Sequence, residues 1–79
     1  MNLTMIYSAL NDIAAPITQV FPATEGIEGG IVIDDTWLIQ VSKNSEEPIL
    51  LDLIDTNGMI HECGSFNSIN NLLKFMMEN

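Results

Sequence analysis

The spacing of apolar residues changes twice along this chain, and these changes constrain the fold more than any other feature. Towards both ends, apolar residues recur at intervals of three and four, which places them on one face of an α-helix. The pattern predicts helices over Leu3–Ala14 and Ser68–Met77. Pro16 disfavours helical geometry at the residue before it, so the first helix should end there. Ser65 or Asn67 is the expected cap of the second helix.

Between the two helices the apolar residues alternate with polar ones, as they do in half-buried β-strands. Asp34-Asp35 and Thr56-Asn57-Gly58 have the composition of turns. The sequence therefore predicts an α+β fold: an N-terminal helix, an antiparallel β-meander of three to four strands and a C-terminal helix, with the helices on one face of the sheet. The expected strands are Ile31–Ile33, Thr36–Ser42, Ile49–Asp55 and Met59–Cys63.

Residues 16–30 contain two prolines and three glycines, and we interpret them as an irregular, packed connection. That connection is too short to separate two domains, so residues 1–79 should form a single small domain. The apolar residues that the patterns point inward define the expected core. They are Leu3, Ile6, Leu10, Ile39, Leu51, Leu53, Leu72 and Leu73.

The chain carries no recognisable catalytic, cofactor or metal motif. His61 and Cys63 alternate on one expected strand, about 6–7 Å apart at their Cα atoms, which is long for a nucleophile–base pair. Together they are too few ligands for zinc, and no window fits an EF-hand, a phosphate-binding loop or a dinucleotide motif. We therefore expect no enzyme activity, no metal and no cofactor.

The charge balance restricts the partners. The formal net charge is −9, with eleven acidic residues and two basic ones, Lys43 and Lys74. Binding of nucleic acid or of an anionic membrane would need a basic patch, so neither is expected. The N-terminal residues lack the positive charge of a signal peptide, and no apolar run has the roughly 20 residues of a membrane helix. With a single cysteine, a cytoplasmic location fits best.

The acidic residues recur at turns and strand ends, where they would surround the sheet with negative potential. Acidity of this kind can serve solubility alone, or it can complement a basic surface on another protein. Under the second interpretation, the acidic positions and the one tryptophan are the candidate partner-binding residues. They are Glu25, Glu28, Asp34, Asp35, Trp37, Glu46, Glu47, Asp52, Asp55 and Glu62.

In size, charge and element order, from Leu3–Ala14 through Ile31–Cys63 to Ser68–Met77, the chain resembles the small acidic inhibitors of phages and other mobile elements, anti-CRISPR proteins above all. The resemblance rests on no shared motif, so it carries over no functional residue. It implies a non-catalytic protein that binds a host CRISPR effector, in some cases where DNA or guide RNA would lie.

Two alternatives stay open beside this interpretation. An immunity protein, an antitoxin or a small assembly subunit could also be acidic and bind a different protein, and a homodimer is compatible with the sequence. The methionine-rich apolar face of the last helix, around Phe75 and Met76, could belong to the core or to a partner contact.

Overall fold

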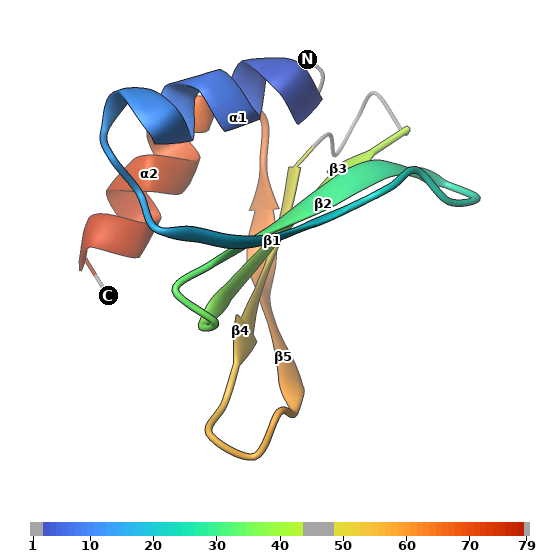
Figure 1. Cartoon of the computed structure of the whole chain (residues 1–79), viewed down its shortest axis with the longest axis vertical. Helices are drawn as coiled ribbons and strands as arrows, with labels where there is room; N and C mark the ends of the chain where they lie inside the picture. Colours follow the sequence, from blue (N-terminus) through green and yellow to red (C-terminus); the bar gives the residue numbers. More distant parts are fainter. Residues whose placement is uncertain (1–2, 44–48, 79) are drawn as a thin grey trace.

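The computed structural model describes residues 3–43 and 49–78. A five-stranded antiparallel sheet in the order β1-β2-β3-β4-β5 is preceded by one helix and followed by another (Figure 1). The elements are α1 (Leu3–Asp12), β1 (Ile17–Phe21), β2 (Ile27–Ile33), β3 (Trp37–Ser42), β4 (Ile49–Ile54), β5 (Ile60–Phe66) and α2 (Ile69–Glu78). The α+β class and the antiparallel meander are confirmed, but the sheet has five strands rather than three to four.

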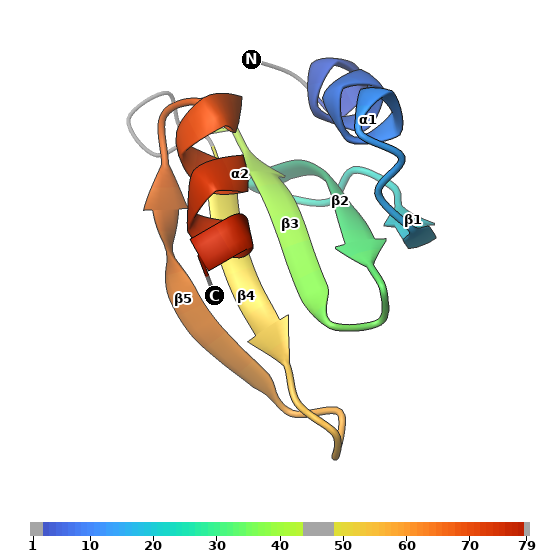
Figure 2. The same cartoon turned by 90° about the vertical axis from the view of Figure 1, so that its left-hand side faces the viewer.

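Both helices lie on the same face of the sheet (Figures 1 and 2). Ile6 and Leu10 of α1 and Leu72 of α2 are fully buried against the inward side chains of β2, β3 and β4. A ring contact between Phe66 and Phe75, with centroids 5.5 Å apart, packs α2 against the end of β5. The core cluster of buried residues consists of Ile6, Leu10, Ile31, Ile33, Ile39, Val41, Ile49, Leu51 and Leu72.

Three of the expected core residues are less buried than predicted. Leu3 and Leu73 are partly buried and pack against the cluster. Leu53 is half-buried and lies outside it. Leu53 pairs with Trp37 on β3 and His61 on β5, one row before the Ile54–Ile60 pair that adjoins the β4–β5 turn. Figure 1 shows this hairpin extending beyond the two helices, so its residues receive less cover.

The interpretation of residues 16–30 as an irregular connection is wrong, because β1 and the first half of β2 form there. Gly29 lies inside β2 with φ at 156°, next to a shift in the pairing register. A Cβ atom at Gly29 would lie 2.5 Å from Leu3 Cδ2 and 3.1 Å from the carbonyl oxygen of Phe21. The glycine therefore marks a place where helix α1 and strand β1 both come close to β2, and not a break between elements.

The end of the sheet also differs from the prediction. Gly64 does not end the last strand, because it pairs with Leu51 and β5 continues to Phe66. A register shift between Leu51 and Asp52 accommodates the extra residue on β5. The cap of α2 is Ser68 rather than Ser65 or Asn67: its Oγ accepts a hydrogen bond of 3.2 Å from the amide of Asn71.

Helix α1 ends in a Schellman motif that has alanine where glycine is usual. The amide of Ala14 donates to the carbonyl of Asn11, and the amide of Ala15 donates to the carbonyl of Leu10, both at 3.0 Å. Ala14 takes the left-handed conformation, with φ at 56°. This backbone strain is the cost of turning the chain from α1 into β1 within four residues.

Ala14→Gly should stabilise the protein by up to about 1 kcal/mol. Glycine adopts a positive φ without steric strain, and this gain exceeds the extra entropy that it gives the unfolded chain. Urea denaturation would measure the difference. Ala9→Gly, inside α1, is the matched control and should destabilise by about 1 kcal/mol. A loss of stability in Ala14→Gly would contradict the left-handed assignment.

Candidate functional site

The predicted partner-binding residues do not form one site, because the strand order separates them. The β2–β3 and β4–β5 turns lie at one end of the sheet and bring Asp34, Asp35 and Asp55 to that end. Glu25 and Glu28 belong to the β1–β2 hairpin at the opposite end. Asp52 and Glu62 face each other across β4 and β5, between the two ends. Glu46 and Glu47 lie outside the described residues.

The Asp34-Asp35 turn is the best-anchored acidic element. Both residues have positive φ, 53° and 51°, as a type I′ hairpin turn requires. Strand β1 and the residue before it hold the turn from the side. The carbonyl of Pro16 accepts a hydrogen bond from the amide of Asp34 at 2.8 Å, and Thr18 Oγ1 of β1 accepts one from the amide of Asp35 at 3.2 Å. Both aspartates are exposed, so a backbone that is held in place presents two carboxylates to solvent.

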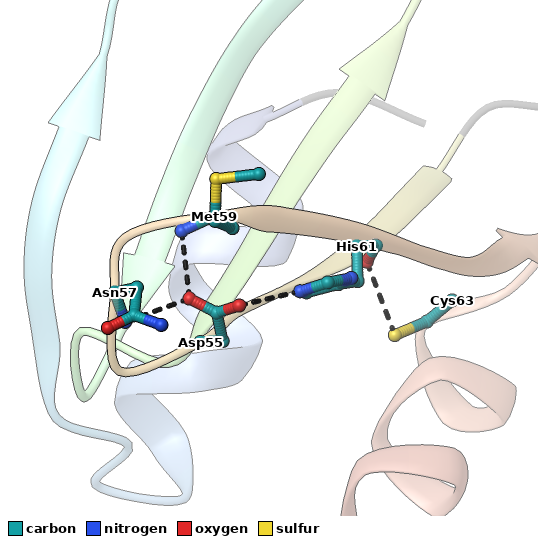
Figure 3. Close-up of polar contacts among 5 residues, drawn as sticks. All are labelled: Asp55, Asn57, Met59, His61 and Cys63. Carbon is teal, nitrogen blue, oxygen red and sulfur yellow. Dashed lines mark hydrogen bonds and ion pairs between the residues drawn. The ribbon is translucent and has the colours of Figure 1, made fainter.

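Asp55 organises the β4–β5 turn (Figure 3). Its Oδ1 accepts hydrogen bonds from the amides of Asn57 and Met59, each at 2.9 Å, and its Oδ2 lies 2.7 Å from His61 Nε2. The hydrogen bond to His61 and those to the two amides favour the carboxylate, so the pKa of Asp55 is lowered from its ordinary value. The charge of Asp55 is thus used within the turn and is less available to a partner than those of Asp34 and Asp35.

Asp52 lies on the face of the sheet that the helices leave open. Partial burial raises the pKa of Asp52, and the neighbouring Glu62 carboxylate raises it further by repulsion. Two like charges directly opposite each other on paired strands disfavour the sheet. Ionisation of this pair therefore opposes the folded state.

We expect Asp55 to titrate at a lower pH than Asp52, in a carboxyl-carbon NMR titration. Ionised Asp55 stabilises the folded state, so its contribution is present at neutral pH and is lost as the pH falls through its lowered pKa. Asp52 acts in the opposite sense: its ionised form disfavours the folded state, and protonation removes that effect as the pH falls through its raised pKa.

A His61→Ala variant supplies the control for this titration. It removes one hydrogen bond from Asp55, so the pKa of Asp55 should rise towards its ordinary value and stay below it, because the Asn57 and Met59 amides remain. The pKa of Asp52 should not move. An Asp55 that titrates at or above Asp52 in the unaltered protein would contradict the hydrogen-bond network.

The ring of His61 and the thiol of Cys63 do not form a nucleophile–base pair, because each has a different hydrogen-bond partner. The ring of His61 is bonded to Asp55, while Cys63 Sγ lies 3.7 Å from the backbone carbonyl oxygen of His61 (Figure 3). Cys63 is a free, half-buried thiol that packs against the core cluster. In the part of the chain that is described, no group of three His, Cys, Asp or Glu side chains is arranged to hold a metal ion.

Trp37, a candidate partner-binding residue, is not fully exposed. It lies on the same face of β3 as Ile39 and Val41, and that face is the one that the helices cover. Its side chain is half-buried against the core cluster and forms part of the wall of a groove between the helices.

That groove is the feature which the sequence analysis missed. It has a volume of about 220 Å³ and lies between the carboxyl-terminal halves of α1 and α2, above the β2–β3 turn. Ile13 and Met77 line it and are 56% and 83% exposed, although both are large and apolar. The only sign of it in the sequence is that both apolar stripes continue to the ends of their helices. Its walls include Ile13, Pro16, Asp34, Trp37, Leu73 and Met77.

A second hollow, of about 260 Å³, lies on the opposite face of the sheet. Phe21 covers Gly30 there, with its ring 3.6 Å from the position of a Cβ atom, and Leu38 forms part of the lining. Its lining contains no charged residue. Of these two hollows, the Asp34-Asp35 turn adjoins the first.

No protein-family model, curated protein or solved structure matches this chain. Within residues 3–43 and 49–78, neither helix is long and apolar enough to span a membrane.

Proposed function

We propose that the protein is a non-catalytic, cytoplasmic inhibitor of the anti-CRISPR kind, which binds a basic, nucleic-acid-binding surface of a host defence complex. The observation that carries the proposal is the Asp34-Asp35 turn, which exposes two carboxylates and whose backbone amides are held by hydrogen bonds to Pro16 and Thr18. A pre-organised acidic group loses little entropy on binding, so its attraction to Lys and Arg is not spent on ordering a loop.

The overall charge supports the same proposal. A net charge of −9 creates a long-range field that speeds association with a basic surface. Little of this charge is neutralised internally: among the described residues the sole ion pair is that between Asp55 and His61, and it requires protonated histidine. The partner that such a field selects most strongly is a protein channel lined with Lys and Arg for DNA or RNA.

The test uses purified CRISPR effector complexes, with DNA binding and inhibitor binding measured separately. Asp34→Asn/Asp35→Asn is the informative variant, because asparagine keeps the positive φ of the turn while the net charge changes from −9 to −7. Lysine at these positions would strain the turn and confuse the result. We expect the variant to associate several-fold more slowly, and affinity to fall steeply between about 50 and about 500 mM salt.

Glu25→Gln/Glu28→Gln is the matched control, since it removes the same charge at the other end of the sheet. It should slow association less. Affinity that is flat across the salt range and equal in both variants would contradict the proposal. Loss of DNA binding at saturating inhibitor indicates that the inhibitor occupies the nucleic-acid channel, whereas simultaneous binding indicates a block elsewhere on the complex. High-affinity binding to a toxin, with none to any effector, would favour the immunity or antitoxin alternative.

A further inference from the structure

The groove between the helices has a mainly apolar lining, and the residues and helix ends around it give a negative electrostatic potential. The carboxyl-terminal half of α1 and the residues that follow it, Ile13 and Pro16, form one wall, and Leu73 and Met77 of α2 form the other. Figure 2 shows the two helices beside each other over the sheet, with the C-terminus at this side. Ile13 and Met77 are exposed and line the same groove, and apolar side chains gathered in one groove, unlike scattered ones such as Met59, are typical of interaction sites.

Three sources of negative potential surround this apolar lining. Helix α1 ends at Asp12 and α2 at Glu78, and neither has a basic residue in its last turn. The carboxyl end of a helix carries a partial negative charge of about half an elementary charge. The one lysine of α2, Lys74, lies before its last turn. Asp34 itself lines the groove, and Asp35 follows it in the fixed turn.

We propose that this groove receives an apolar side chain from a partner segment that has Lys or Arg on both sides of it. The apolar side chain fills the space between Ile13 and Met77, while the basic residues meet Asp34 and the two helix ends. This inference rests on the proposed function and names the contact within it: the acidic turn steers the partner, and the groove anchors it.

A second copy of this chain is the less suitable occupant. Its own net charge is −9, and it could offer only Lys43 and Lys74 to the acidic rim of the groove. Bringing two such surfaces together would place like charges side by side, which costs free energy instead of contributing it. The charge around the groove therefore selects a basic partner over a homodimer.

The single tryptophan gives a direct measurement, because Trp37 lines the groove. The probe is a short peptide with phenylalanine and leucine at its centre, arginine and lysine on both sides, and no tryptophan. Binding should change the fluorescence of Trp37 and shift the amide NMR signals of Ile13, Asp34 and Met77. Two further peptides complete the set, one with serine in place of the apolar pair and one with glutamate in place of the basic residues. Neither should produce these changes.

Ile13→Ser/Met77→Ser removes the two exposed apolar walls without touching the core cluster or the acidic residues. It should weaken binding of the basic apolar peptide at least about tenfold, the effect of withdrawing one buried apolar side chain. Met59→Ser is the matched control: Met59 is 61% exposed at the β4–β5 turn, and the change should leave binding unaltered. Unchanged far-ultraviolet circular dichroism in both variants confirms that they fold.

The outcomes separate this inference from the proposed function. Equal binding of the serine peptide, or an affinity that Ile13→Ser/Met77→Ser does not alter, would overturn the groove as the anchor. The proposed function would survive that result if Asp34→Asn/Asp35→Asn still slows association with a CRISPR effector. Conversely, the protein could bind the peptide in its groove and bind no CRISPR effector. That result would support the groove as a binding site and contradict the proposed inhibitor function. Formation of a stable homodimer that blocks the peptide would overturn the choice of occupant.

Discussion

Leu51→Ala should remove about 2–5 kcal/mol from the free energy of unfolding, measured by urea denaturation. Leu51 is fully buried at the centre of β4, where it pairs with Ile39 on β3 and Gly64 on β5. The glycine contributes no side chain that could move into the space left by the leucine, so the cavity should stay open. A chain of 79 residues has a total stability of roughly 4–12 kcal/mol, so this loss is a large fraction of the total.

Leu53→Ala is the matched control for this prediction. It deletes the same atoms two residues further along β4, from a side chain that is half-buried and outside the core cluster. The loss of stability should be smaller, because the deleted atoms are already partly in contact with water. Equal losses in the two variants would contradict the partial burial of Leu53 outside the core cluster.

Leu72→Ala should have a comparable effect by a different route. Leu72 is the one fully buried residue of α2, and it fixes the helix to the core cluster. The expected loss is about 2–5 kcal/mol. The helix should detach before the sheet unfolds, so the amides of α2 should exchange with solvent sooner than those of β3 and β4. Hydrogen exchange measured by NMR would show the order.

Met77→Ala is the comparison for Leu72→Ala, since it truncates an exposed side chain of the same helix. Its stability should stay within about 0.5 kcal/mol of the unaltered protein. Simultaneous exchange of α2 and the sheet in Leu72→Ala would contradict the expected order. It would show instead that the helix and the sheet unfold as one cooperative unit.

The sequence predicted those elements whose apolar period is unbroken. Both helices, strands β3 and β4, and β5 as far as Cys63 follow from spacing alone. Strand β1 and the first half of β2 were missed because Gly29 and Gly30 look like the punctuation of a loop. Their role depends on Leu3 and Phe21, which come close to Gly29 only after the helix and the hairpin have packed.

The candidate site was predicted less completely, and for a related reason. Asp34 and Asp35 were correctly placed in a turn, since aspartate tolerates positive φ. Their separation from Glu25 and Glu28 depends on the order of the strands in the sheet. The apolar pattern of each separate segment does not predict that order. Trp37 was proposed for partner binding, yet it is half-buried, because its exposure depends on which face of the sheet the helices cover. The groove belongs to no single segment and arises only where α1 and α2 meet.

The strand order has a consequence for how the protein reaches its fold. Each strand pairs with the next one along the chain, so the whole sheet is a series of hairpins. Such local pairing closes only short loops, which favours rapid folding for a protein this rich in strands. During synthesis each hairpin can form soon after its second strand emerges. The last step is the arrival of α2, because Leu72 must join Ile6 and Leu10 across nearly the full length of the chain. The walls of the groove therefore come together only when the final helix has been made.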